Sequence, residues 1–236
     1  HAAWLNTAAL AKAGIGRETP DPYGGVIVRD PSGEPTGLLL ERAVELVTPH
    51  LPIPPADRML AAVREAQQEA HRLGVTGIHD VEGPEALAAF RQLETEGRLR
   101  LRVLFHPPVA RLADLVSHRV QSGMGTEWLS LGGIKLFLDG SLGSRTAWML
   151  EAYEDGRDCG MPITTESEAR AAVALAAAAG IAATVHAIGD AAGRRAPEPL
   201  SSAPKVVLTH RSAHSTCRPP PDHRPPPHHG AIRDTP

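Results

Sequence analysis

The sequence has few cysteines, little net charge and no long apolar run, and each shortage argues against a class of protein. Cys159 and Cys217 are too few for a disulfide framework. No apolar run approaches the roughly 18 residues of a membrane span, and no basic, apolar and cleavable leader opens the chain. A net charge of -3 gives no field that would indicate nucleic acid or an anionic membrane as a partner. We therefore expect a soluble, cytoplasmic protein whose partner is a small molecule.

Hydrophobic periodicity divides the middle of the chain into alternating helices and strands. With 236 residues and 42% hydrophobic content, the chain can bury a sizeable core. Glycines stand where several helices should stop, and Thr165 with Glu168 forms a capping-box pattern. The expected helices are residues 56–73, 84–96, 109–121 and 165–180, and the expected strands are residues 75–79, 101–105, 131–139, 181–186 and 205–210.

Alternation of this kind predicts a parallel sheet covered by helices, either a closed (β/α)8 barrel or an open doubly wound sheet. An open nucleotide-binding sheet would favour a glycine-rich phosphate turn, and neither common pattern is present. Polar residues stand at several strand ends, as at the catalytic rim of a barrel. We therefore predict an α/β fold of the (β/α)8 type: His79, Asp80, His106, Asp139, His186 and His210 would form the rim.

The two ends of the chain do not follow the alternation. Residues 1–55 contain a short helical pattern followed by a Pro/Gly-rich stretch, which predicts a loop-rich insertion of the barrel domain. Residues 56–210 are predicted to form the partial (β/α) barrel. Residues 211–236 are rich in proline and histidine and have no core-forming pattern, so we expect a disordered tail. The abrupt change in composition near residues 193–210 also raises the hypothesis of a shifted reading frame, which resequencing the gene would test.

Lys135 is the anomaly of the predicted barrel, because it interrupts an apolar strand that should be buried on both faces. Burying an unpaired ammonium costs several kcal/mol or more, so the group must be paired, neutralised or chemically converted. Asp139 and Asp80 are the candidate ion-pair partners. His186 ends the next apolar strand, where an imidazole serves either as a metal ligand or as an ordinary hydrogen-bonding group.

Four segments of the chain resemble the YtcJ-like amidohydrolases, the amidohydrolase 3 group of metal-dependent hydrolases. The resemblance implies a metal-dependent (β/α)8 barrel, with a small β-sandwich built from both chain ends, that hydrolyses the C–N bonds of amide-like substrates. The segments are His1-Ala-Ala-Trp-Leu-Asn-Thr-Ala-Ala-Leu10, Gly74-Val-Thr-Gly-Ile-His-Asp80, Gly133-Ile-Lys-Leu-Phe-Leu-Asp-Gly-Ser-Leu-Gly-Ser-Arg-Thr-Ala147 and Val185-His-Ala-Ile-Gly-Asp190.

The resemblance also implies roles for particular residues. Lys135 matches a lysine that carbon dioxide carboxylates and that then bridges metal ions, and His186 matches a histidine ligand. The sixth-strand histidine has a degraded match: His214 is the candidate and His210 the fallback. Arg145 is a candidate substrate-binding residue, with an exposed structural arginine as the alternative. The implied cofactor is one or two divalent metal ions, most simply zinc, which would activate water for attack on the substrate carbonyl.

Two expected parts of the family pattern are missing. No His-x-His stands on a strand, and after Pro219 no strand can carry the aspartate expected to act as general base. The pattern therefore predicts barrel strands two to six of a longer enzyme, as an incomplete or inactive amidohydrolase with no complete catalytic set. The alternative is a non-catalytic truncated barrel or a metal-binding fragment. A Schiff-base lysine at Lys135 is a third possibility.

Overall fold

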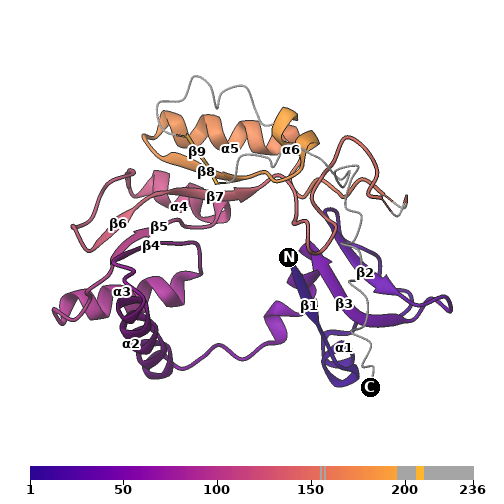
Figure 1. Cartoon of the computed structure of the whole chain (residues 1–236), viewed down its shortest axis with the longest axis horizontal. Helices are drawn as coiled ribbons and strands as arrows, with labels where there is room; N and C mark the ends of the chain where they lie inside the picture. Colours follow the sequence, from indigo (N-terminus) through magenta and orange to yellow (C-terminus); the bar gives the residue numbers. More distant parts are fainter. Residues whose placement is uncertain (155, 157, 196–205, 210–236) are drawn as a thin grey trace, which may run out of the picture.

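The computed structural model describes residues 1–154, 156, 158–195 and the backbone of 206–209. The described strands form three sheets of three strands each, one antiparallel and two parallel (Figure 1). The antiparallel sheet contains β1 (Ala2–Trp4), β2 (Gly25–Arg29) and β3 (Pro35–Glu41). The parallel sheets contain β4 (Gly77–Asp80), β5 (Arg102–Phe105) and β6 (Leu129–Leu131), and β7 (Gly133–Phe137), β8 (Ala182–His186) and β9 (Val206–Thr209).

Backbone hydrogen bonds connect the two parallel sheets through the chain that follows β5. The Gly132 N–H donates to the Phe105 carbonyl at 2.8 Å, and the Lys135 N–H donates to the Pro107 carbonyl at 2.7 Å. β7 therefore lies beside the extension of β5, and β8 and β9 follow in parallel order. Figure 1 shows the strands from β4 to β9 as one curved array. The α/β class and the parallel alternation predicted from the sequence are confirmed.

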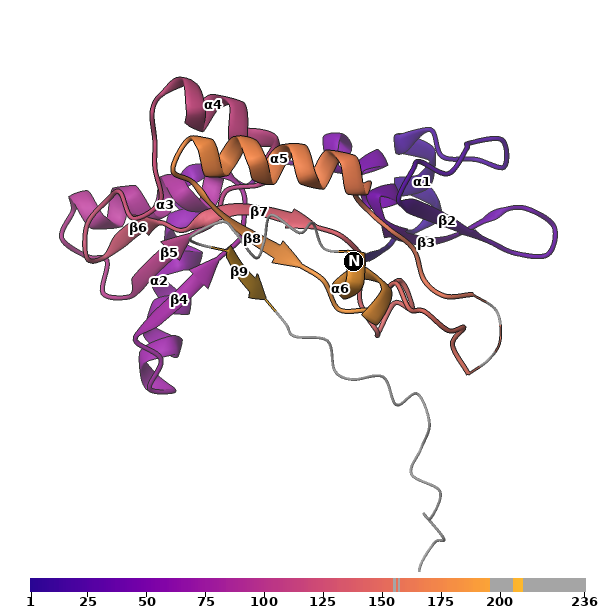
Figure 2. The same ribbon diagram turned by 90° about the horizontal axis from the view of Figure 1, so that it is seen from above.

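Helices cover one face of this array and leave the other face for polar side chains. Ile134, Leu136 and Leu138 pack in one core cluster with Val173 of α5, so the side chains between them point to the opposite face. Figure 2 shows α5 lying along β7 and β8. The described helices are α1 (Thr7–Ala13), α2 (Ala56–Arg72), α3 (Pro84–Thr95), α4 (Leu112–Ser117), α5 (Glu166–Ala178) and α6 (Asp190–Arg195), with 3₁₀ turns η1 (Arg42–Leu46), η2 (Thr48–His50) and η3 (Val109–Arg111).

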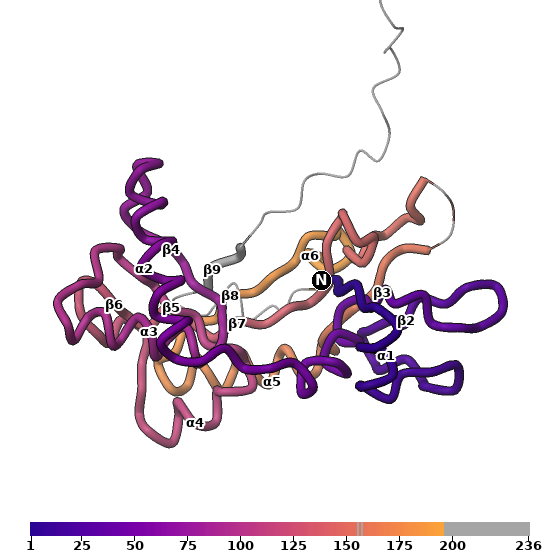
Figure 3. Tube along the Cα trace, turned by 90° about the horizontal axis from the view of Figure 1, so that it is seen from below, coloured from indigo at the N-terminus to yellow at the C-terminus, as the bar shows by residue number. Residues whose placement is uncertain are grey.

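The N-terminal segment has more regular structure than the predicted loop-rich insertion. β1, β3 and β2 pair in that order, and a separate small core lies against them, formed by Ile15, Ile27, Leu39, Ala43 and Val47. The start of the chain lies close to the end of β8, since the ring centroid of His1 is 4.9 Å from that of His186; Figure 3 gives a view of this region. The antiparallel sheet therefore stands at the carboxyl ends of β7 and β8, where the sequence placed the site. The predicted tail, residues 211–236, lies outside the described residues.

Candidate metal and substrate site

A cavity of about 650 Å³ opens where the antiparallel sheet meets the ends of β7 and β8. Lys135 and His186 both line it, so the structure brings together two of the predicted metal ligands. They come from neighbouring strands: Lys135 pairs with Thr184, and Phe137 pairs with His186. The remaining lining residues are His1, Ala2, Glu41, Arg42, Val44, Glu45, Val81, Glu82, Phe137 and Ile163.

Lys135 is 7% exposed, in agreement with the buried strand predicted from the sequence. Its Nζ lies 4.4 Å from the centre of the Phe137 ring, a cation–π distance. Burial lowers the pKa of the Lys135 ammonium from 10.5 to about 8, because a low-dielectric environment disfavours the charged form. Near neutral pH, a far larger fraction of Lys135 is therefore in the neutral amine form than of a solvent-exposed lysine.

His186 is oriented by a backbone carbonyl at the end of β7. Its Nε2 lies 2.9 Å from the Gly140 carbonyl oxygen, which can only accept, so Nε2 carries a proton, and in the neutral ring Nδ1 has the lone pair. Metal-binding histidines are typically held in this way, with the second nitrogen donating to an oxygen. Asp190, four residues further along the chain, accepts the Leu150 N–H at 2.8 Å and begins α6.

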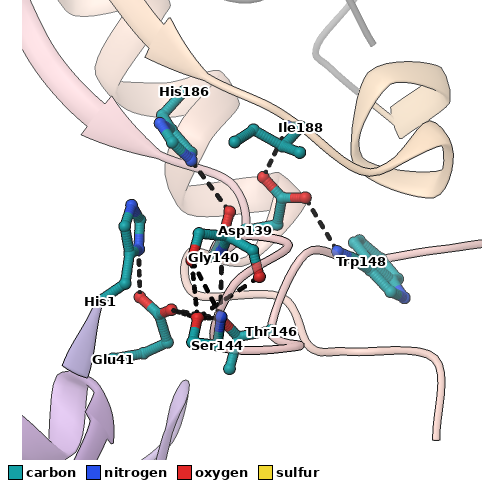
Figure 4. Close-up of polar contacts among 10 residues, drawn as sticks. His1, Glu41, Asp139, Gly140, Ser144, Thr146, Trp148, His186 and Ile188 are labelled. Atoms are coloured by element: carbon teal, nitrogen blue, oxygen red, sulfur yellow. Dashed lines mark hydrogen bonds and ion pairs between the residues drawn. The ribbon is translucent and has the colours of Figure 1, made fainter. Parts of the chain in front are cut away.

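Asp139 is fully buried and organises the backbone around the site. Its carboxylate accepts three N–H donors, from Trp148 at 2.8 Å, Ile188 at 3.0 Å and Gly189 at 2.7 Å. Figure 4 shows the contacts with Trp148 and Ile188. Burial raises the pKa of Asp139, and the three backbone hydrogen bonds offset part of that effect. The carboxylate thereby connects the end of β7 to the excursion that follows it and to the segment after β8.

Glu41 and His1 were not predicted as site residues, yet both line the cavity. The Glu41 side chain is 4% exposed, and its carboxylate accepts the His1 Nδ1–H at 2.8 Å and the Thr146 hydroxyl. Its backbone is unusual for a residue other than glycine, with φ 49° and ψ -125°. Glu41 directly follows the apolar residues of β3, and a polar residue at such a strand end was the available signal.

A second group of buried polar side chains lies on the same face of the array. His106 Nδ1 lies 3.0 Å from the Gly133 nitrogen, 3.2 Å from the Gly133 carbonyl oxygen and 2.8 Å from Thr184 Oγ1. Its Nε2 makes a hydrogen bond of 2.9 Å with His79 Nδ1, and the tautomers of the two rings set the direction of this bond. Burial lowers the pKa of His106, which favours the neutral ring. The sequence placed both histidines at strand ends but did not predict their contact.

The structure describes one of the other two predicted site residues, Arg145, and not the other, His214. Arg145 is exposed on the turn after β7, with φ 58°, and is not among the lining residues. His214 and its fallback His210 lie outside the described residues. Within the described part of the chain, no group of three or more His, Cys, Asp or Glu side chains could hold a metal ion. Lys135 and His186 therefore provide two donor positions, fewer than a complete metal site needs.

Comparison with known proteins identifies the class. The sequence model of the amidohydrolase family, Amidohydro_3, matches residues 1–223. The chain belongs to this family, as a YtcJ-like member. It is 34% identical over 204 residues to the putative amidohydrolase YtcJ of Bacillus subtilis (strain 168), covering 81% of this chain and 37% of that protein. It is also 34% identical over 205 residues to the protein LONG AFTER FAR-RED 3 of Arabidopsis thaliana, covering 81% of this chain and 35% of that protein.

A solved structure supports the same class. The crystal structure of an uncharacterized metal-dependent hydrolase from Pyrococcus furiosus superposes with a TM-score of 0.64 at 30% identity, covering 87% of this chain and 42% of that chain. The chain thus spans between 35% and 42% of the length of these three proteins. Among the described helices, none is long and apolar enough to cross a membrane.

Proposed function

We propose that this chain contributes part of the site of a metal-dependent amidohydrolase that cleaves C–N bonds of amide-like small molecules. The observation that carries the proposal is that Lys135 and His186 occupy neighbouring strands and line one cavity. The curved parallel array would be an arc of a (β/α)8 barrel, whose catalytic groups gather at the carboxyl ends of the strands. Membership of the amidohydrolase family supports the hydrolase class.

Lys135 and His186 offer two of the donors that a divalent metal ion needs, and zinc is the proposed identity of that ion. His186 presents Nδ1 as the donor nitrogen while Gly140 holds Nε2–H. The neutral Lys135 amine can attack carbon dioxide, forming an N–C bond and losing one proton, and the resulting carbamate supplies oxygen donors. A bound divalent metal ion lowers the pKa of a coordinated water and polarises a carbonyl group. Such a site needs further ligands, and we assign these to residues other than Lys135 and His186.

A non-catalytic role is the competing function, and the small number of donors in the described residues favours it. A non-catalytic truncated barrel would bind metal weakly or not at all at Lys135 and His186, and a metal-binding fragment would bind metal but hydrolyse no amide. Metal content separates the two functions more directly than activity, because activity also requires the correct substrate.

The test measures zinc and carbamate on the full chain. The chain is incubated with zinc and ¹³C-bicarbonate, and bound zinc and a ¹³C carbamate resonance are quantified after removal of excess metal. We expect both signals in the wild type, no carbamate in Lys135→Ala and loss of zinc in Lys135→Ala and His186→Ala. The exposed histidine His118, changed to alanine, serves as the control and should leave both signals unchanged. A wild type without stoichiometric zinc, or variants that bind as the wild type does, would contradict the proposal.

A further inference from the structure

The His1–Glu41 pair presents a hydrogen-bond acceptor to the cavity beside His186. A carboxylate can only accept, so the 2.8 Å contact fixes a proton on His1 Nδ1, and in the neutral ring the lone pair is then on Nε2. The His1 side chain lines the cavity and is 30% exposed. None of the residues that the structure describes makes a hydrogen bond to His1 Nε2. The ring therefore has one committed nitrogen and one acceptor nitrogen available to a ligand.

Several contacts hold this imidazole in place. Its ring centroid lies 4.9 Å from that of His186 and 5.8 Å from that of Phe137. Its backbone carbonyl accepts the Glu41 N–H at 2.9 Å, so the two residues are joined through both main chain and side chain. Figure 4 shows the His1 ring standing between the Glu41 carboxylate and His186. An imidazole restrained in this way recognises a ligand group of fixed position, because little side-chain freedom remains to be lost on binding.

Gly140 contributes to the orientation of both His186 and His1. Its carbonyl orients His186, and a Cβ at this position would lie 2.2 Å from Glu41 Oε1 and 2.0 Å from Thr146 Oγ1. Only a residue without a side chain leaves room for the Glu41 carboxylate here. Glu41 is also held in a strained backbone conformation, which proteins retain most often at functional sites. The geometry thus places two oriented imidazoles on one cavity wall.

We propose that His1 Nε2 accepts the N–H of an amide substrate, with Glu41 as the residue that positions the imidazole. The inference rests on the proposed function and narrows its substrate class to amides that carry an N–H, primary or secondary. A fully N-substituted amide has no hydrogen for Nε2 and would place an alkyl group against the imidazole. The cavity volume, about 650 Å³, is within the range of small-molecule sites.

The experiment compares two probe amides on the metal-free full chain. N-butylacetamide has the N–H and N-butyl-N-methylacetamide lacks it, and NMR titration gives the dissociation constant of each. We expect the secondary amide to bind about tenfold more tightly, the factor that one ordinary hydrogen bond supplies. His1→Phe should remove this preference. Equal binding of the two amides, no binding of either, or a preference that survives in His1→Phe overturns the inference.

The positioning role of Glu41 has its own readout, the tautomer of His1. Imidazole ¹⁵N shifts of the wild type should show a protonated Nδ1 and an unprotonated Nε2. Glu41→Leu removes the acceptor and should give a tautomer mixture with a reduced amide preference, whereas Glu41→Gln retains a carbonyl oxygen and should restore both. Glu45→Leu is the matched control, because Glu45 lines the same cavity without contacting His1. A wild-type His1 protonated on Nε2, or a preference unchanged in Glu41→Leu, overturns the role of Glu41.

This inference can fail independently of the proposed function. The amide titration and the His1 tautomer measurement use neither zinc, nor carbamate, nor turnover. An N–H preference in a chain that binds no zinc would retain the inference and reject the hydrolase site. Bound zinc and a carbamate signal in a chain without an N–H preference would support the hydrolase site and reject the inference.

Discussion

At the residue scale, Lys135, a cation in an apolar strand, indicated the position of the candidate site. A buried lysine is costly in any fold, so Lys135 could be singled out without knowledge of its neighbours. His106 shows the limit of that argument. Its ring fits against Gly132, where a Cβ would lie 2.4 Å from the imidazole, and this contact depends on the one-residue change of register between β6 and β7. The register between these strands cannot be predicted from the pattern of residue types along the chain.

Lys135 should make the stability of the metal-free chain depend on alkaline pH. The folded pKa of about 8 lies below the unfolded value of 10.5, so the lysine destabilises the fold most below pH 8. The penalty disappears as pH rises from 8 to about 10.5, because the unfolded chain then also loses the proton. We expect Lys135→Met to be more stable than the wild type by about 3 kcal/mol at pH 7 and by much less at pH 10.5.

Urea unfolding in carbonate-free buffer measures this difference, and the other titrating groups cancel between the two proteins. A stability difference that stays constant from pH 7 to pH 10.5 would show that the pKa of Lys135 is not depressed.

At the element scale, local signals placed most helices well. α2 (Ala56–Arg72) and α3 (Pro84–Thr95) end within a residue or two of the predicted ends. The predicted helix over residues 109–121 is instead η3 followed by the short α4. Arg119 takes φ 54°, a left-handed conformation that stops the helix before the last predicted turn. β6 was not predicted, since three residues are too short to show a period.

The capping box predicted at the start of α5 is confirmed and gives a test at this scale. The Thr165 side chain accepts the Glu168 N–H at 3.2 Å, and the Glu168 carboxylate accepts the Thr165 N–H at 3.0 Å. Thr165→Ala should lower the free energy of unfolding by about 1 kcal/mol, because an N–H at the helix start loses its acceptor. Thermal unfolding measures the change.

Thr95→Ala is the control for the capping test. Its hydroxyl donates to the Arg91 carbonyl inside α3 and caps no helix start. It should leave stability within about 0.5 kcal/mol of the wild type. A loss as large in Thr95→Ala as in Thr165→Ala would assign the effect to threonine removal in general.

At the scale of the whole molecule, Asp139 joins segments that are far apart in sequence. Asp139→Ala leaves three N–H donors without their acceptor and should cost about 3 kcal/mol or more in the free energy of unfolding. Asp139→Asn keeps one oxygen and should cost less. Asp158→Ala is the matched control, an exposed aspartate in the same excursion that accepts the Gly160 N–H at 3.0 Å. Urea unfolding measures all three, and an Asp139→Ala cost no larger than that of the control would contradict the cross-linking role.

The sequence by itself determined the α/β class, the alternation of helices and strands and the family, and it singled out Lys135 and His186 as candidate site residues. These features depend on hydrophobic periodicity, capping residues and the cost of a buried charge, which are written in neighbouring positions of the chain. The tertiary structure alone decided that the N-terminal sheet reaches the ends of β7 and β8 and brings His1 and Glu41 into the cavity. That contact joins residues about a hundred positions apart, as in the Thr146–Glu41 hydrogen bond, and such pairings follow from packing rather than from local pattern.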